Sequence, residues 1–456
     1  MSLDPNTRLT VVVLANCCLD DPSCHRRGLP LAVQRVCGVP LVRRHLQVVR
    51  AYEWRQIVIV VPPGAQQLVE AVVGDPRTLG VRVNYIEASQ GSFPARSPLH
   101  LNTEQFLILE GHYVIEGALL EALMTREAEA VLCDGHPNHS VPLTVRVQDG
   151  QVAAWGEQAA QPTHAYAGAT LLSCAALQRL AAHGASPWPE SLAQLGPLKA
   201  VDVRREDLYV AEVRRKVEPL WQAVETPADA ERCKRALVTA AQKHTVDIIA
   251  WNINRPLENA LALRVADGPI TPNWVTLLTL VVAYIAALLF LSRHWLLASF
   301  TTLVVNVLDG VDGKLARAKA LSSRLGQLEH SLDLLYEQSW YISFTWATFM
   351  QRKEVWVVAV GFLMLLSDTA ARHVSMQFRQ TMGVSLADYA PFDRTFRRFD
   401  GRRNIYTVYM LLGALTGRPS YALCAMALHA LVTSMVYFLR AAKHLRSADV
   451  GAARRG

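Results

Sequence analysis

Four acidic residues in two consecutive apolar segments have the spacing of a polar site between helices. Asp309 and Asp312 lie in the first segment (NVLDGVDGKLAR), and Glu329 and Asp333 lie in the second (GQLEHSLDLLYE). Offsets of three and four residues place each pair on one helical face. An ionised carboxylate in a membrane span costs several kcal/mol unless it is compensated, so four facing carboxylates require cations. Because the donors are all oxygens, we expect Mg²⁺ or Mn²⁺, with calcium as an alternative, rather than zinc.

A metal-free arrangement is the other interpretation of these residues. Asn306 shares the helical face of Asp309 and Asp312, so the polar surface extends over several turns. A structural charge network or a proton relay would also place carboxylates inside a helical bundle. The spacing of further residues, given below, favours the metal site.

These residues belong to the C-terminal part of a 456-residue chain, where the long apolar runs are concentrated. A helix needs about 20 apolar residues to cross a membrane, and the fifth run reaches that length only with its polar start around Asn404. The sequence therefore predicts an all-α polytopic membrane domain over residues 269–445. Its expected spans, about six, are 272–291, 294–313, 327–349, 354–374, 404–416 and 419–441.

Basic residues between the apolar runs predict the orientation of the protein. The connections after the second and fourth runs are rich in lysine and arginine, whereas the other connections are short and less basic. Basic loops remain on the cytoplasmic side and meet anionic lipid. We therefore expect a multi-pass protein of the cell (inner) membrane, with its N-terminal domain and its basic tail, residues 446–456, in the cytoplasm.

Residues 1–240 have the pattern of a soluble α/β domain. The runs 9–15 and 56–61 are continuous, β-branched and of strand length, as buried parallel strands are. Strands are also expected at 81–86 and 105–109, and helices at 41–52 and 66–73. This alternation predicts an open, mostly parallel sheet. The basic residues that give the net charge of +7 do not form a stripe with aromatic residues, so nucleic acid is not an expected partner.

Residues 241–268 form a junction between the two domains. Apolar residues such as Trp251, Leu257 and Leu261 alternate there with charged residues. One interpretation is an amphipathic segment at the membrane interface, broken near Pro256. The other, equally weighted, is a linker helix packed on the soluble domain.

The membrane domain, over roughly residues 255–441, resembles the CDP-alcohol phosphotransferase family. The run Asp309-x-x-Asp312-Gly313-x-x-Ala316-Arg317, followed after eight residues by Gly326, matches the family signature residue for residue. The sequence Thr-Pro-Asn at 271–273 resembles the family's entry to the first span.

The chain departs from the family after Gly326. The family has aspartates four and eight residues beyond that glycine, where this chain has His330 and Leu334. Glu329 and Asp333 form an acidic pair with the same spacing of four residues, one residue before the two family positions. We interpret them as functional replacements, and the third ligand remains open between Glu329 and His330.

The resemblance implies transfer from a CDP-linked donor to an alcohol acceptor, with CMP as the leaving group, in phospholipid synthesis. Asp309, Asp312 and the acidic group at 329 would hold metal, and Asp333 would hold metal or accept the acceptor's proton. The resemblance also implies a homodimer formed through the membrane domain. The residues expected to contact the CDP moiety are Asn306, Gly313, Ala316, Arg317 and Gly326.

Four arginines before the fifth run are candidates for binding a phosphorylated acceptor such as inositol phosphate. A guanidinium suits a phosphate, although the orientation of the membrane domain explains basic residues at this place equally well. The four residues are Arg397, Arg398, Arg402 and Arg403.

The N-terminal domain resembles the sugar-nucleotide and polyol-phosphate nucleotidyltransferases. The segments that carry the resemblance are GLPLAVQRVCGVPLV at 28–42 and WQAVETPAD at 221–229. That family holds phosphates with a glycine-rich loop, but the corresponding residues 16–21 here are NCCLDD. Glu110 or His112 occupies the first metal position, and Ala223 and Glu225 replace the expected aspartates at the second.

These departures predict that the N-terminal domain is catalytically degenerate. The fusion is nevertheless the layout of bifunctional enzymes that make inositol phospholipid precursors. A bifunctional enzyme is therefore the first alternative to a transferase with an inactive N-terminal domain. A non-catalytic membrane scaffold is the second.

Overall fold

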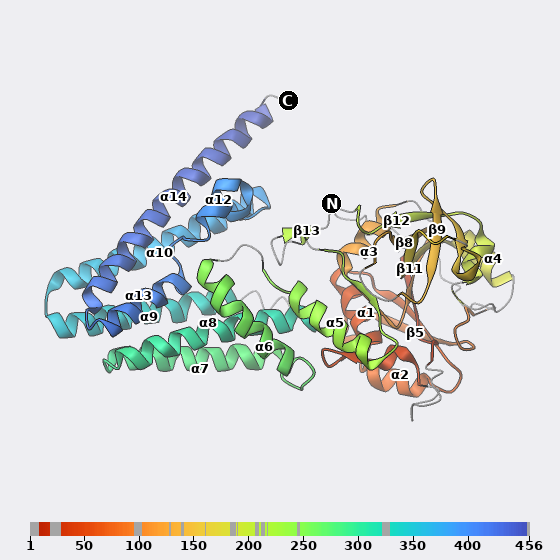
Figure 1. The fold of residues 1–456 in the computed structure, drawn as a ribbon, viewed down its shortest axis with the longest axis horizontal. Coiled ribbons are helices and arrows are strands. Elements are labelled where there is room, and N and C mark those ends of the chain that lie inside the picture. The colour runs from red at the N-terminus through yellow and green to blue at the C-terminus, as the bar shows by residue number, and fades with distance from the viewer. Residues whose placement is uncertain are drawn as a thin grey trace.

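The computed structural model describes residues 9–18, 29–94, 103–126, 129–137, 141–159, 161–182, 188, 190–205, 209–210, 215–216, 218–243, 247–321 and 329–453. Gly326, Asp20 and Asp21 lie outside these residues, as do the side chains of Glu329 and His330. Figure 1 shows an α/β domain beside a bundle of long helices, with α5 and α6 between them.

The N-terminal domain is built on a mixed sheet. Within the described residues, nine strands pair in the order β5-β4-β1-β6-β11-β8-β12-β10-β9. The first four are parallel, and β8 and β12 are parallel to each other, whereas β11 pairs antiparallel with β6 and β8. The strands are β1 (Leu9–Leu14), β4 (Gln56–Val61), β5 (Arg82–Glu87), β6 (Gln105–Glu110), β8 (Ala130–Asp134), β9 (Thr144–Gln148), β10 (Gln151–Trp155), β11 (His164–Ser173) and β12 (Leu198–Asp202).

Helices cover both faces of this sheet. Residues of α1 (Leu41–Ala51), α2 (Gln66–Val73) and α3 (Gly117–Met124) share one apolar core with one face, and α4 (Cys174–Ala182) packs on the other. The predicted α/β architecture is thus confirmed, with antiparallel strands at one side. Three short pairs complete the domain: β2 (Arg35–Val36) with β3 (Val39–Pro40), β7 (Tyr113–Ile115) with β15 (Trp221–Ala223), and β13 (Tyr209–Val210) with β14 (Arg215–Lys216).

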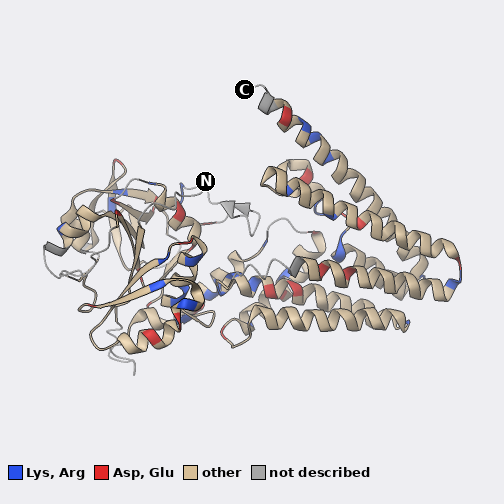
Figure 2. Cartoon of the chain, turned by 180° about the vertical axis from the view of Figure 1, so that it is seen from behind, with Lys and Arg blue, Asp and Glu red and all other residues tan. Residues whose placement is uncertain are grey.

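The C-terminal domain is helical, as predicted. Its long helices are α7 (Pro272–Leu291), α8 (Trp295–Ala318), α9 (Glu329–Arg352), α10 (Val355–Met382), α13 (Arg403–Leu415) and α14 (Pro419–Ala453), with the short α11 (Leu386–Tyr389) and α12 (Pro391–Phe396) between α10 and α13. Figure 2 shows few charges along these helices and more of them where the bundle meets the α/β domain.

Four helices of the described chain, α7, α8, α10 and α14, are long and apolar enough to cross a membrane. Two expected spans do not meet that criterion. The helix α9 is long but carries Glu329, Asp333 and Glu337, and α13, with 13 residues, is only about 20 Å long. Six spans therefore remain a prediction.

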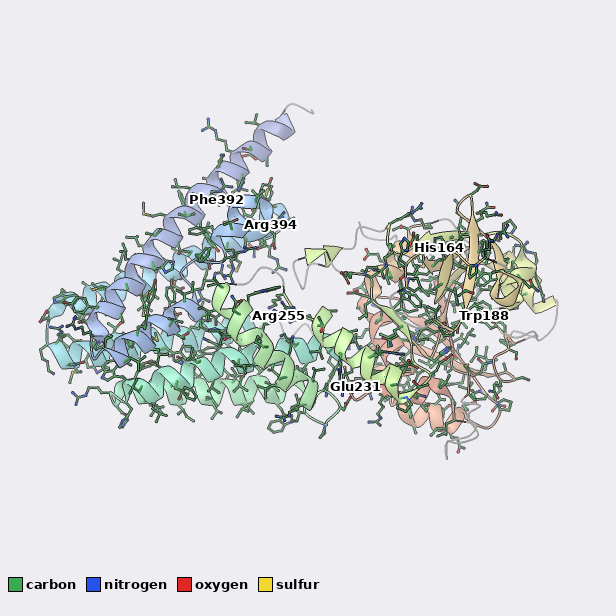
Figure 3. The ribbon with its side chains drawn as sticks, in the orientation of Figure 1. His164, Trp188, Glu231, Arg255, Phe392 and Arg394 are labelled. Atoms are coloured by element: carbon green, nitrogen blue, oxygen red, sulfur yellow. The ribbon has the colours of Figure 1, made fainter. Side chains whose placement is uncertain are left out.

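From residue 248 to Val265 the junction is one continuous helical stretch. A π-helical turn, Ala250–Asn254, leads directly into α6 (Arg255–Val265), and Arg255 stacks on Trp251 at 4.1 Å (Figure 3). The expected break near Pro256 does not occur, because proline is tolerated in the first turn of an α-helix. Instead the hydrogen-bonding pattern changes there from π to α.

The junction contacts both domains. The helix α5 (Pro227–Ala240), last of the N-terminal domain, packs on α6 and α8, and α6 packs on α8. A shared apolar core includes Cys37 and Leu41 from the N-terminal domain, Ala262 from α6, and Leu315 from α8. The opposite side of the junction exposes Ile253, Leu257 and Leu261, which lie four residues apart. This arrangement supports the amphipathic interpretation.

Candidate functional site

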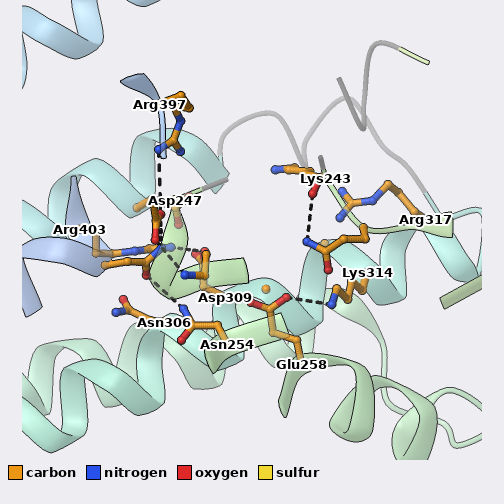
Figure 4. A pocket seen from close by; sticks show the side chains of 16 residues that line it. Lys243, Asp247, Asn254, Glu258, Asn306, Asp309, Lys314, Arg317, Arg397 and Arg403 are labelled. Atoms are coloured by element: carbon orange, nitrogen blue, oxygen red, sulfur yellow. Dashed lines mark hydrogen bonds and ion pairs between the residues drawn. The ribbon is translucent and has the colours of Figure 1, made fainter. Parts of the chain in front are cut away.

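Two of the predicted acidic residues, Asp309 and Asp333, line a cavity between α8, α9, α13 and the junction (Figure 4). Of the residues proposed from the sequence, those that line it are Asn306, Asp309, Gly313, Arg317, Asp333, Arg397 and Arg403. Asp312, Ala316, Arg398 and Arg402 belong to the same elements but are not in its lining. The structure thus brings together helical segments and a loop that are well separated in the sequence.

Asp309 is held by two side chains from other helices. Its Oδ1 accepts a hydrogen bond from the Tyr336 hydroxyl at 3.0 Å, and its Oδ2 pairs with the Arg403 guanidinium. Arg403 also approaches Glu337 Oε1 at 3.4 Å. One arginine therefore compensates two carboxylates inside the bundle.

Asp312 is directed toward another helix. It is buried, and its Oδ2 accepts a hydrogen bond from Thr276 of α7 at 2.8 Å. Asp333 lines the cavity together with Asp309. Two of the predicted acidic residues therefore converge on the cavity, while Asp312 connects α8 to α7.

The chemistry of these donors fits a divalent cation. Asn306 donates a hydrogen bond from Nδ2 to Thr407 at 3.0 Å, but its buried Oδ1 has no hydrogen-bond partner among the described residues. This oxygen and the carboxylates of Asp309 and Asp333 border one cavity, and hard divalent cations bind such oxygens. No three His, Cys, Asp or Glu residues form a metal-binding group in the described part of the chain, from which the Glu329 side chain is missing.

Four of the five residues expected to contact CDP occupy the same helix as Asp309, and the fifth, Gly326, lies outside the described residues. Gly313 borders the cavity beneath Arg317, and a Cβ built at Gly313 would lie 3.2 Å from an Arg317 Nη atom. Arg317 itself donates from Nε to the Ala241 carbonyl at 2.8 Å. The absence of a side chain at Gly313 thus leaves room for the Arg317 guanidinium.

The four candidate arginines have different surroundings. Arg397 and Arg403 line the cavity, and Arg397 pairs with Asp400 at 2.8 Å. Arg402 also approaches Asp400, at 3.3 Å, outside the cavity lining. The Arg398 carbonyl accepts a hydrogen bond from the Ile248 N–H of the junction at 3.0 Å. Only two of the four are therefore placed to meet a ligand in the cavity.

Lys314 and Glu258 are cavity residues that sequence reasoning missed. Lysine at a helix end commonly extends to the membrane surface, which is what we expect of Lys314 from the sequence alone. That expectation is wrong, because Lys314 is 1% exposed and pairs with Glu258 of α6 at 2.9 Å. Burial raises the pKa of Glu258, and Lys314 opposes that shift. A glycine at 310 makes this contact possible, since a Cβ there would lie 2.2 Å from the Glu258 carboxyl carbon.

The first metal position expected in the N-terminal domain, at Glu110 and His112, is buried. Glu110 ends β6, and its Oε2 lies 3.7 Å from Nε2 of His112. Burial, together with Glu225, raises the pKa of Glu110 to about 8, and burial lowers the pKa of His112 to about 4. Glu110 and His112 therefore form a buried pair at the position where the resembling family has a metal-binding aspartate.

Comparison with known proteins agrees with this geometry. A protein of Thermococcus kodakarensis, named bifunctional IPC transferase and DIPP synthase, is 29% identical over 186 residues, 40% of this chain and 41% of that protein. A protein of the same name from Rubrobacter xylanophilus is 24% identical over 87% of this chain and 89% of its own length. The inner membrane protein YnjF of Escherichia coli is 42% identical over 76 residues, 36% of its length.

The N-terminal half also has neighbours among solved structures. The inositol-1-phosphate CTP transferase of T. maritima aligns over 48% of this chain and 90% of its own, with a TM-score of 0.39 and 18% identity.

One family model covers most of the helical domain. Residues 269–435 match CDP-alcohol phosphatidyltransferase, a family whose members generally use divalent metal ions. The match spans α7 to α13 and most of α14, including Asp309, Asp312 and Asp333. Residues 269–435 of this chain are therefore a CDP-alcohol phosphatidyltransferase domain.

Proposed function

We propose that the cavity transfers a substituted phosphate from a CDP-linked donor to an alcohol acceptor and releases CMP. The observation that carries the proposal is the convergence of Asp309, Asp333 and the unpartnered oxygen of Asn306 on one cavity. The agreement of the signature with the family match supports it. Incubation with radiolabelled CDP-diacylglycerol and candidate polyols or polyol phosphates, scoring CMP release, tests it directly.

Each side chain has a role in the proposed reaction. Asp333 accepts the proton of the acceptor hydroxyl as that oxygen attacks the phosphorus that carries the donor's alcohol. The bond from that phosphorus to the bridging oxygen breaks, and CMP leaves with the bridging oxygen. Arg317 and Arg397 border the cavity, where guanidinium groups can hold phosphate oxygens.

A divalent ion, Mg²⁺ or Mn²⁺, offsets the charge of the diphosphate when it is bound. The residues that would hold it are Asp309 and Glu329, with Asn306 as a further oxygen donor and with Asp333 if another group takes the proton. Asp312, also proposed from the sequence as a ligand, contacts Thr276 and would need to turn toward the cavity to join them. We also propose a phosphorylated polyol as acceptor, because Arg397 and Arg403 line the cavity. The cytoplasmic placement of the N-terminal domain and a homodimer belong to the same proposal, and cross-linking in native membranes tests the dimer.

The spacing at the start of α9 gives a sharp prediction about ligands. We expect Glu329→Gln and Asp333→Asn each to lower CMP release by at least about a hundredfold, as loss of a metal ligand or base does. His330→Gln is the matched control and should lose much less activity. An inactive His330→Gln variant beside an active Glu329→Gln variant would show instead that a nitrogen ligand or a histidine base is used.

We further propose that the N-terminal domain no longer transfers nucleotides. The replacement of the expected aspartates by Ala223 and Glu225 supports this, as does the glycine-free segment NCCLDD. The alternative is a bifunctional enzyme, favoured by the name of the Rubrobacter xylanophilus relative, which spans nearly the whole chain. We expect the purified full chain to release no pyrophosphate from CTP with inositol 1-phosphate. Sustained pyrophosphate release would establish the bifunctional alternative.

A further inference from the structure

One wall of the cavity is formed by residues that come before the matched domain in the sequence. Gln242 and Lys243 follow α5, and Asp247, Asn254 and Glu258 belong to the junction. The family match begins only at residue 269. Part of the site thus comes from the segment that leaves the N-terminal domain.

Hydrogen bonds attach this wall to the membrane domain on both sides of Lys243. Before it, the Ala241 carbonyl accepts from Arg317 Nε at 2.8 Å. After it, Asp247 Oδ2 accepts from Asn404 Nδ2 at 2.8 Å. These bonds attach Ala241 to α8 and Asp247 to α13.

The cations of the cavity are arranged in two groups. Figure 4 shows Lys243 near Arg317 at one end, with Arg397 and Arg403 at the other. Arg397 and Arg403 pair with carboxylates, as does Lys314. Lys243 also lies within electrostatic range of Asp309. Two cations from different elements repel each other at short range, and an anion bound between them removes that repulsion.

We propose that Lys243, acting with Arg317, binds a phosphate group of a substrate in this cavity. The inference rests on the proposed transfer function. The phosphate belongs either to the CDP part of the donor or to a phosphorylated acceptor, since both present the same anionic oxygens. In either case the segment that leaves the N-terminal domain supplies a binding group to the transferase, which makes the soluble domain part of the transfer site.

Binding measurements on the full chain in lipid nanodiscs test this assignment. The probes are CDP for the donor and glycerol 3-phosphate for the acceptor, each titrated by calorimetry. Lys243→Ala should weaken binding of one probe by at least about tenfold, the usual effect of losing a hydrogen bond to a charged group. Lys243→Arg should restore most of the affinity. The matched control is Arg235→Ala on α5, because Arg235 is exposed and pairs only with Glu231 among the ion pairs described.

The outcomes distinguish the two sources of phosphate. Weaker CDP binding assigns Lys243 to the donor, and weaker glycerol 3-phosphate binding assigns it to the acceptor. Unchanged affinity for both probes, or a wild-type chain that binds neither, overturns the proposal. Lys243→Gln keeps the length of the side chain without its charge, and it replaces Lys243→Ala if that variant does not fold. Because binding needs no turnover, a wild-type chain that binds CDP but releases no CMP would refute the transfer function alone.

Discussion

Asp309→Asn should reduce CMP release by at least about a hundredfold, because it removes a charge that balances cations at the reaction centre. The substitution keeps the shape of the side chain and its hydrogen bond from Tyr336. It removes the negative charge that faces Arg403 and, in the proposed reaction, a divalent ion. The measurement is CMP release at saturating magnesium or manganese, with the amount of protein in the membrane fraction followed in parallel.

Asp449→Asn is the control for this variant, since Asp449 is exposed near the end of α14. It should retain wild-type activity. Asp312→Asn should also be inactive, although its carboxylate contacts Thr276 rather than the cavity. Near-normal activity of Asp309→Asn would contradict a metal site built on this helix.

Arg403→Ala should destabilise the membrane domain by about 3–5 kcal/mol, the usual cost of removing one partner from a buried ion pair. Asp309 would lose the guanidinium that compensates it, and Glu337 would keep only its pairing with Arg372. Unfolding of the detergent-solubilised chain, followed by tryptophan fluorescence, measures the change in the free energy of unfolding. Arg403→Lys should recover only part of it, since an ammonium group cannot bridge two carboxylates in the same fork geometry.

The matched control for this loss is Arg418→Ala, because Arg418 is exposed in the turn between α13 and α14 and stacks only on the ring of Tyr421. We expect its stability to change by less than about 0.5 kcal/mol. An unfolding free energy of Arg403→Ala equal to that of wild type would show that water or another cation compensates the two carboxylates.

Local pattern was enough to predict the first strands and helices of the N-terminal domain and the long helices of the C-terminal domain, but not β8 to β12, α3 or α4. The strand at 9–15 and the helix at 66–73 occur as β1 and α2, since continuous β-branched runs and amphipathic spacing are decided by neighbouring residues. The first apolar run coincides with α7. Asp309 and Asp333 likewise lie on helices, α8 and α9, as their spacing predicts, but their meeting at one cavity depends on how the two helices pack.

Long-range partners could not be predicted in this way. Arg403 lies 94 residues after Asp309, and no periodicity in either segment indicates that their side chains pair. The same is true of Lys314, whose partner Glu258 belongs to the junction helix. Helical spacing also gave Asp312 the same face as Asp309, whereas packing of α7 directs Asp312 to Thr276. Tertiary contacts, rather than propensity, decide these placements.

The apolar core shared by the two halves restricts how this gene can be rearranged. The Arg44 guanidinium of the N-terminal domain donates to the Ala318 carbonyl at the end of α8, at 2.7 Å. Cleavage of the chain between the halves would leave that buried cation and the facing apolar side chains without their cover. Fission into separate genes is therefore disfavoured. Insertions or deletions within 247–268 are disfavoured too, because they would shift α8 relative to α5, the last helix of the N-terminal domain, which packs on it.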